Sequence, residues 1–354
     1  MCSAVRRTKP TNLLREDKRD IQLDLIRVIS MILVIGIHCA VKPFSASPMI
    51  QKSFIRFMFA CNGMFYMLSG RFALSTKCNT KMEYKKYYIN KVCSIVFPMV
   101  LVTFGVEFCK DIYKNGFSLN ILQYLKHVYE CIMTTNAQNH MWFMYPLIGM
   151  LLGAPFIAKM LDKMEDWELK LLFYIGIGWY IVRTYLTIDF NIGFSYSGWL
   201  LQDFALYFFA GYFCKRIVNE KNKKYWYILG IIGFLITIFG EKIFPVYQNP
   251  ADISAAFLFY TIAMYLFIQY ECKIKTNVSK NIISFLAKHS YAIYLIHGSI
   301  GLAIVHRVLK VDNEYIFFVG HMVVCLVVST CCAMLMNYIV VFPLQKYVKK
   351  SMSN

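Results

Sequence analysis

Arg27 and His38 are eleven positions apart in the apolar stretch DLIRVISMILVIGIHCAV, residues 24–41. In an α-helix this spacing turns the two side chains to within about 20° of one direction, about 16.5 Å apart along the axis. Asp24 lies about one turn before Arg27 on nearly the same face. A charge in the hydrocarbon core costs at least about 2.5–3.5 kcal/mol, so this polar stripe is expected to face the interior of a helix bundle. There an imidazole can act as a general base, a proton relay or a substrate contact.

A simpler interpretation of the stripe remains open. Asp24 and Arg27 lie near the expected membrane surface, where they can pair with each other and leave His38 as a hydrogen-bonded core residue. His38 is harder to explain in this way, because it lies about 16 residues into the hydrophobic run.

Two other apolar segments also carry a histidine. NHMWFMYPL contains His140, and SYAIYLIHGSI contains His297. If consecutive spans alternate in direction, these two histidines and His38 lie at one depth in the outer half of the membrane. Arg27 and Arg71 then lie toward the cytoplasmic side.

Several other residues have ordinary explanations beside functional ones. Trp142 can be an aromatic anchor at the membrane interface. Ser69 and Gly70 can be small residues that let two membrane helices pack closely. Three polar residues in or near spans are either structural hydrogen-bond partners or functional groups: Arg183, Asp203 and His321.

Runs of about 20 apolar residues recur along the 354-residue chain, and each is long enough to cross a ~30 Å hydrocarbon core as a helix. The chain is 58% hydrophobic and only 16% charged, with a mean hydropathy of +0.48, whereas soluble domains carry about a quarter charged residues. We therefore predict an all-α, polytopic integral membrane protein with about ten transmembrane helices and no soluble domain. The stretch 117–135 is poorer in apolar residues and is predicted to be an amphipathic helix lying in the interface. The expected spans are 22–42, 53–75, 88–109, 140–160, 168–188, 198–216, 225–244, 252–270, 282–306 and 314–342.

The distribution of positive charge predicts the orientation. Lys and Arg gather before the first span, after every second span that follows, and at the C-terminus, so both termini are expected in the cytoplasm. The net charge of +18 is then mainly a topology signal, and no nucleic-acid partner is expected. We divide the chain into a basic cytoplasmic segment 1–20, a transmembrane domain 21–345 and a cytoplasmic tail 346–354. The first segment lacks the apolar core and cleavage site of a signal peptide, so the first span is expected to be retained.

The 12 cysteines mostly lie inside hydrophobic runs, where they pack as small apolar residues. The sequence contains no Cys-x2-Cys pair and no familiar Cys/His metal spacing. We expect neither a disulfide framework nor a metal site.

Four motifs, taken in order, resemble acyltransferase family 3 of membrane proteins. They are Arg-x10-His in the first span, LSG near the end of the second, HMWF at the start of a later span, and SYAIYLIH near the C-terminus. The resemblance covers roughly residues 20–345 and is nearest to the stand-alone, surface-polysaccharide O-acetyltransferase branch, without the hydrolase-like domain that some relatives carry. It implies transfer of an acyl group from acetyl-CoA to a hydroxyl of a cell-envelope sugar, in the inner (plasma) membrane of a bacterium.

The resemblance also implies residue roles. Arg27 and His38 would be catalytic, and acetyl-CoA would be bound by Arg27 together with Ser69, Arg71 and Lys91. The acceptor sugar would be contacted by residues of the two later motifs: His140, Trp142, Tyr294 and His297.

One motif departs from the family pattern. Family members commonly carry several arginines at the entrance to the third span, whereas this chain reads YYINKVCSIVFP, with Lys91 and, upstream, Lys85 and Lys86. Arginine binds phosphate through two parallel hydrogen bonds and lysine as a point charge, so the coenzyme would be held differently here.

For this chemistry we expect His38 to remove the proton of the sugar hydroxyl, while His140 or His297 orients the acceptor or stabilises the oxyanion. A covalent acetyl-histidine is an alternative. The acceptor stays open among capsule, O-antigen, common-antigen and peptidoglycan-linked sugars, and the acyl group between acetyl and succinyl.

Two other classes of protein share many of these features. A transporter or flippase for a polysaccharide or lipid-linked sugar would also have many spans with polar groups inside, but no Gly/Pro-broken spans occur in two matching halves. An inactive partner of an export complex is the second alternative, and the intact Arg27 and His38 argue against it.

Overall fold

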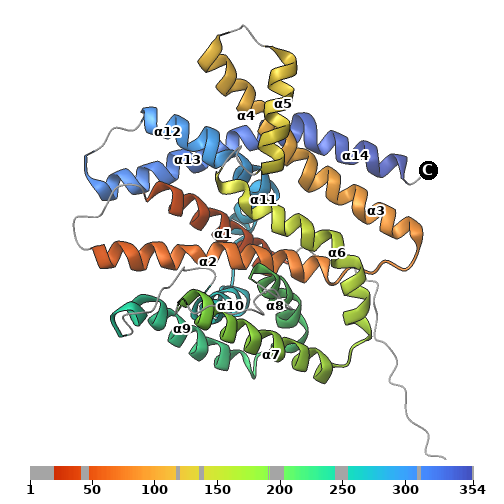
Figure 1. Ribbon diagram of the computed structural model, residues 1–354, viewed down its shortest axis with the longest axis vertical. Coiled ribbons are helices and arrows are strands. Elements are labelled where there is room, and N and C mark those ends of the chain that lie inside the picture. Colours follow the sequence, from red (N-terminus) through yellow and green to blue (C-terminus); the bar gives the residue numbers. More distant parts are fainter. Residues whose placement is uncertain are drawn as a thin grey trace, which may run out of the picture.

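The computed structural model describes residues 20–40, 48–116, 120–134, 139–189, 191, 203–243, 254–308 and 312–352. In these ranges all regular structure is helical and no strand occurs (Figure 1), so the predicted all-α class is confirmed. Most of the predicted N-terminal segment, residues 1–19, lies outside the described residues. So do the last two residues of the predicted C-terminal tail and the ends of several predicted spans, at 41–42, 198–202, 244 and 252–253.

Each of the ten predicted spans corresponds to a helical stretch, and several stretches are interrupted by a short π-helical segment. The elements are α1 Ile21–Cys39, α2 Pro48–Ala73, α3 Lys81–Lys91, η1 Val92–Val96, α4 Phe97–Asn115, α5 Ile121–Thr134, η2 Asn139–Phe143, α6 Met144–Lys163, α7 Asp166–Arg183, η3 Thr184–Asp189, α8 Phe204–Ile217, α9 Lys223–Ile243, α10 Ala255–Tyr270, α11 Asn277–Ile296, η5 His297–Gly301, α12 Leu302–Val308, α13 Glu314–Met336, η6 Asn337–Val341 and α14 Phe342–Ser351.

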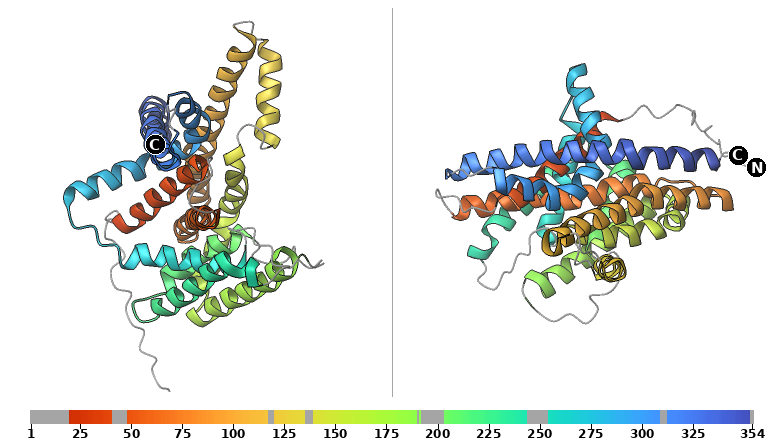
Figure 2. Two further views of the ribbon diagram at one scale, coloured as in Figure 1. Left: turned by 90° about the vertical axis from the view of Figure 1, so that its left-hand side faces the viewer. Right: turned by 90° about the horizontal axis from the view of Figure 1, so that it is seen from above.

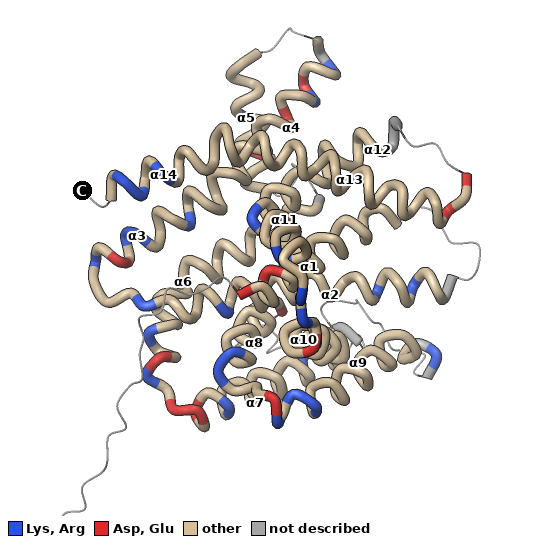
Figure 3. Tube along the Cα trace, turned by 180° about the vertical axis from the view of Figure 1, so that it is seen from behind, with Lys and Arg blue, Asp and Glu red and all other residues tan. Residues whose placement is uncertain are grey.

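Five of these stretches are long and apolar enough to cross a membrane: Ile21–Cys39, Lys81–Lys114, His140–Lys163, Lys223–Gly240 and Glu314–Ser351. The prediction of a helical membrane protein is therefore supported, while the number of ten spans and the cytoplasmic position of both termini stay predictions. Lys, Arg, Asp and Glu lie mostly toward the ends of helices, and the middle of α13 carries none (Figure 3).

Helix α1 lies inside the bundle, as its polar stripe requires. It packs against α2, α10, α11 and α13, and α1 and α11 lie between the layer of α2 and the layer of α13 (Figures 1 and 2). Asp20 caps its first turn by accepting hydrogen bonds from the amides of Gln22 and Leu23, at 3.0 and 3.4 Å. The buried positions of α1 include both apolar residues and Asp24, while Arg27 and His38 are partly buried.

Helices α2 and α8 approach each other almost backbone to backbone. A Cβ atom at Gly70 would lie 1.7 Å from the carbonyl oxygen of Phe208, and one at Gly211 would lie 1.8 Å from that of Met67. Small residues permit this approach between membrane helices. The ordinary explanation of Gly70 in the LSG motif, close helix packing, is confirmed.

Helix α5 corresponds to the predicted interfacial helix. With α4 it forms a hairpin that projects from the bundle, and it runs across the direction of α2 and α13 (Figures 1 and 2). Its exposed residues include a row of large apolar side chains: Ile121, Leu122, Leu125, Tyr129 and Met133. Such a face suits the boundary of a bilayer, and its position there stays a prediction.

We expect Gly70→Ala to disrupt the α2–α8 contact. Its new methyl group overlaps a backbone carbonyl, which cannot rotate away as a side chain can, so the cost is expected to reach or exceed the ~1–3 kcal/mol of overpacked cores. The matched control is Gly105→Ala on α4, where a Cβ atom meets nothing within 4 Å. Thermal unfolding in detergent should show a lower Tm for Gly70→Ala and an unchanged or higher Tm for the control. Equal Tm values would contradict the close contact.

Candidate active site

Three histidines from three separate elements meet inside the bundle. The ring centroid of His38, on α1, lies 6.2 Å from that of His140 on η2 and 5.2 Å from that of His297, the first residue of η5. The rings of His140 and His297 are 4.7 Å apart. The sequence predicted that these residues share one depth, and the structure brings them into a single cluster, which we term the histidine cluster.

Backbone carbonyls fix the orientation of two of these rings. Nε2 of His140 donates to the carbonyl oxygen of Leu295 at 3.2 Å, and Nδ1 of His297 donates to that of Tyr294 at 2.6 Å. Because a carbonyl oxygen can only accept, each of these nitrogens carries the proton in the neutral ring. The remaining nitrogens, Nδ1 of His140 and Nε2 of His297, therefore have lone pairs.

The lone pair of His297 has no partner in the part of the chain that the structure describes. His297 is fully buried, and its Nε2 atom has no hydrogen-bond partner among the described residues. A buried polar atom without a partner costs about 1–3 kcal/mol, so such an atom needs an explanation. A bound substrate or a proton in transit would satisfy it.

The η2 turn is locked onto α11 by a reciprocal pair of hydrogen bonds. The hydroxyl of Tyr294 donates to the backbone carbonyl of His140, while the His140 side chain donates to the carbonyl of Leu295. Tyr294 therefore positions His140 directly, and its own backbone carbonyl positions His297.

Gly298 makes room for His140. A Cβ atom at this position would lie 2.2 Å from Nδ1 of His140. Gly298 is the second residue of the π-helical segment η5, and such segments inside helices occur frequently at functional sites. The glycine of the IHGSI stretch was not singled out from the sequence, because the contact that requires it comes from a residue 158 positions away.

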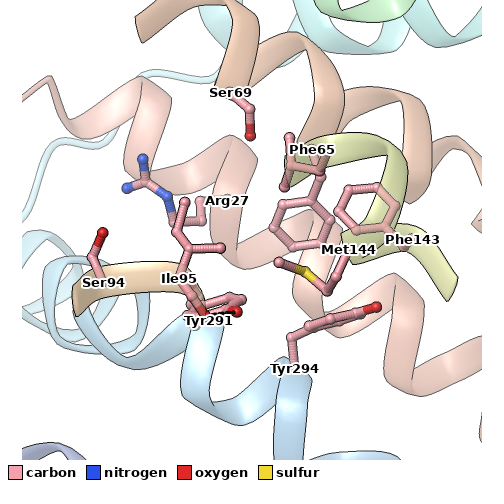
Figure 4. Close-up of a pocket in the computed structure, with 11 residues that line it drawn as sticks. Arg27, Phe65, Ser69, Ser94, Ile95, Phe143, Met144, Tyr291 and Tyr294 are labelled. Carbon is pink, nitrogen blue, oxygen red and sulfur yellow. Dashed lines mark hydrogen bonds between the residues drawn. The ribbon is translucent and has the colours of Figure 1, made fainter. Parts of the chain in front are cut away.

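A cavity of about 260 Å³ adjoins the histidine cluster through Tyr294. Figure 4 shows Arg27, Ser69 and Ser94 toward one side of it and Phe143 and Tyr294 toward the other. Its surface is mostly apolar between these groups. The lining residues are Arg27, Phe65, Ser69, Ser94, Ile95, Phe143, Met144, Leu147, Ser290, Tyr291 and Tyr294.

Arg27 both pairs with Asp24 and lines the cavity. Its Nη1 atom lies 2.8 Å from the Asp24 carboxylate, whose side chain is only 4% exposed, and its guanidinium lies 5.9 Å from the centre of the Phe72 ring. The ion pair of the simpler interpretation is thus present. Arg27 also lines the cavity, however, so the pair fixes a cation at its wall.

The remaining predicted donor-binding residues lie at different distances from this cavity. Ser69 lines it, and Lys91 immediately precedes η1, whose residues Ser94 and Ile95 also line it. Arg71 does not line it. Its guanidinium donates to Oε1 of Gln269 on α10 at 3.3 Å.

Trp142 shares the η2 turn with His140 but faces elsewhere. Its ring is 5.4 Å from that of Phe204 and is 39% exposed. It is thus more exposed than the other predicted acceptor-binding residues, His140, Tyr294 and His297, which are buried.

Arg183, Asp203 and His321, for which the sequence left both a structural and a functional role open, all make local contacts. Arg183 pairs with Asp203 at 2.5 Å, and this pair joins α7 to the residue before α8. Nδ1 of His321 donates to the carbonyl of Phe317 at 2.7 Å, and the two rings stack at 3.6 Å. These contacts favour structural roles.

The comparisons with known proteins agree with this combination of a helical membrane fold and a buried polar site. The model of the acyltransferase domain of acyltransferase family 3 matches residues 20–338. The chain therefore belongs to acyltransferase family 3, and its class is that of a membrane acyltransferase. No curated protein and no solved structure matches it.

We expect Gly298→Ala to impair acyl transfer by displacing His140. A misplacement of about 1 Å at a reacting group can cost about a hundredfold in rate, and the new methyl group would lie 2.2 Å from Nδ1 of His140. The control is Gly149→Ala on α6, where a Cβ atom meets nothing within 4 Å. The measurement is the initial rate of acyl transfer in membranes, normalised to protein content. A Gly298→Ala protein as active as the control would contradict the positioning role.

Proposed function

We propose that this protein is a membrane-bound O-acyltransferase that moves an acetyl group from acetyl-CoA to a hydroxyl of a cell-envelope sugar or polysaccharide. Its proposed location is the inner (plasma) membrane of a bacterium. One observation carries the proposal: a cavity with a cationic, hydroxyl-bearing side adjoins a cluster of three histidines through a shared tyrosine, Tyr294. Such a site offers a channel for the donor and an acid–base group for the chemistry.

The cavity suits the pantetheine arm of coenzyme A. Its apolar walls, which include Phe65, Met144 and Leu147, fit a flexible chain, and Ser69 and Ser94 can hydrogen-bond its amides. A volume of about 260 Å³ is below the usual range of about 300–1,000 Å³ for drug-sized ligands. The nucleotide end would therefore remain outside the cavity, at the cytoplasmic surface.

Positive charge can hold that nucleotide end. Arg27 lines the cavity wall, and Lys91 lies next to the π-helical segment that borders it. Lys85 and Lys86 are exposed on α3, one to two turns before Lys91. Lysine contacts phosphate as a point charge. These lysines would therefore hold the phosphates mainly by electrostatic attraction, without the paired hydrogen bonds that arginine forms.

His38 is the proposed general base. It removes the proton from the sugar hydroxyl as the oxygen attacks the acetyl carbonyl, the C–O bond forms, and the C–S bond breaks as the tetrahedral intermediate collapses. The proton then passes from His38 to the departing thiolate, which leaves as coenzyme A. The lone pairs of His140 and His297 in the same cluster can stabilise the transient positive charge on His38.

His38 fits this role better than its two neighbours do. His140 and His297 are each held by a backbone carbonyl, and both are buried. His38 is partly exposed and lies on α1, the helix that also carries Arg27. It can therefore meet both substrates and turn its ring between them.

We expect His38→Ala to lower acyl transfer by about 10²–10⁴-fold, the usual contribution of a general base. The assay is incorporation of label from radiolabelled acetyl-CoA into envelope glycans of membranes that contain the protein. His289→Ala is the control, because His289 is also a buried histidine but bonds Asn337 at 2.9 Å and lies outside the histidine cluster. Full activity of His38→Ala at an equal protein level would refute the proposed base and direct attention to His297.

We expect Arg27→Lys to raise the KM for acetyl-CoA by about tenfold and to change kcat less, since a charge is kept while the planar group is lost. The same measurement on Arg71→Lys tests the second predicted arginine, for which the contact with Gln269 indicates a smaller effect. An Arg27→Lys protein with an altered KM for the acceptor alone would contradict a donor role.

Binding of acetyl-CoA to the purified native protein tests the proposed class of protein. Failure to bind acetyl-CoA would favour a transporter or an inactive partner protein.

A further inference from the structure

A second group of reactive side chains lies in the α4–α5 hairpin, which projects from the bundle (Figure 1). Glu107 on α4 and both His127 and Cys131 on α5 each offer one ligand atom, and these atoms lie within 4.8 Å of one another. His127 and Cys131 are four residues apart, so they occupy one face of α5. The group contains none of the residues of the candidate active site.

The distances between these atoms are close to those of a tetrahedral zinc site. Nε2 of His127 lies 3.1 Å from Oε2 of Glu107 and 3.5 Å from Sγ of Cys131. In a tetrahedral site with Zn–O and Zn–N bonds of about 2.0 Å and a Zn–S bond of about 2.3 Å, the N···O and N···S separations are about 3.3 and 3.5 Å. The third pair, Glu107 and Cys131, also lies within 4.8 Å, and Sγ of Cys131 is closer to Nε2 of His127 than to Nδ1, which lies 4.0 Å away.

The burial of two of these groups also suits a bound metal ion. Glu107 is only 5% exposed and Cys131 only 4%, whereas the His127 side chain is 58% exposed and leaves access from solvent. Lys110 contacts Oε1 of Glu107 at 2.6 Å, so the second carboxylate oxygen is the one turned toward His127.

We propose that Glu107, His127 and Cys131 bind a zinc ion, with water as the fourth ligand. Sulfur, nitrogen and carboxylate oxygen in a tetrahedral arrangement are the donors that zinc prefers. Binding forms the three metal–ligand bonds, and the Cys131 thiol releases its proton because the thiolate is the ligand. This site is independent of the proposed acyl transfer.

The bound ion would join the hairpin to the active-site turn. It crosslinks α4 to α5, which are otherwise joined by contacts such as the 2.7 Å hydrogen bond from the Tyr124 hydroxyl to the carbonyl of Phe104. The hydroxyl of Tyr145, in the first turn of α6, donates to the carbonyl of Ile132 on α5. Helix α6 follows the η2 turn that carries His140, so a fixed α5 braces this part of the chain.

Cobalt(II) is a suitable probe because it replaces zinc in tetrahedral sites and reports the ligands by its absorption. The full chain, purified in detergent and stripped with a chelator, should develop a near-ultraviolet thiolate-to-cobalt band together with visible bands of tetrahedral cobalt when Co²⁺ alone is added. Added Zn²⁺ should bleach both. Cys131→Ser should lose the near-ultraviolet band, and His127→Gln should weaken cobalt binding by at least about tenfold.

Two matched variants sharpen the experiment. Cys109→Ser, at an exposed cysteine on α4 outside the group, should leave the bands unchanged. Lys110→Ala should tighten cobalt binding, since it frees the carboxylate that Lys110 shares, whereas a purely ion-paired Glu107 would gain no metal affinity. Absence of the bands in the folded native protein, or their persistence in Cys131→Ser, would overturn the proposal. Since His127 is exposed, His127→Gln keeps the test valid if Cys131→Ser unfolds.

Discussion

The site depends on one reciprocal contact between the η2 turn and α11. The Tyr294 hydroxyl donates to the backbone carbonyl of His140, and the His140 imidazole donates to the carbonyl of Leu295. Backbone polar groups at membrane depth must be satisfied inside the protein, and these bonds do so for the carbonyls of His140 and Leu295. They fix the tautomer of His140 and the place of α11, and α11 in turn holds His297 through the carbonyl of Tyr294.

Helix α1 can carry its polar stripe because of where it packs. The cost of placing Asp24, Arg27 and His38 in an apolar span is lowered when each meets a protein group and none faces lipid. Asp24 pairs with Arg27 at 2.8 Å, and His38 lies against the two fixed histidines. The same packing that makes the helix tolerable in a bilayer thus places Arg27 at the cavity wall and His38 in the histidine cluster that adjoins the cavity.

The sequence predicted most of the helices and the common depth of the three histidines, because hydrophobic runs, helical phase and alternating direction can be followed along the chain. It did not predict which predicted donor residues share the cavity. Arg71 and Ser69 are two residues apart on α2, yet Ser69 lines the cavity and Arg71 bonds Gln269. Gly298 was missed for a related reason, since its role depends on the His140 ring. Likewise, spacing along the chain could not group Glu107 with His127 and Cys131, because it is the fold that brings Glu107 to His127.

The three histidines differ in how firmly backbone hydrogen bonds hold their rings, and this difference affects the chemistry that each can perform. A ring whose proton is held by a carbonyl presents a lone pair of fixed direction, as His140 and His297 do. Such groups can accept a hydrogen bond at no reorganisation cost, which is the form of preorganisation that lowers barriers in buried sites. A general base must instead gain and lose a proton within one turnover, and a ring free to change its tautomer is better suited to this. His38 lies beside these two fixed acceptors and on the helix that carries Arg27, so its surroundings suit the proposed general base.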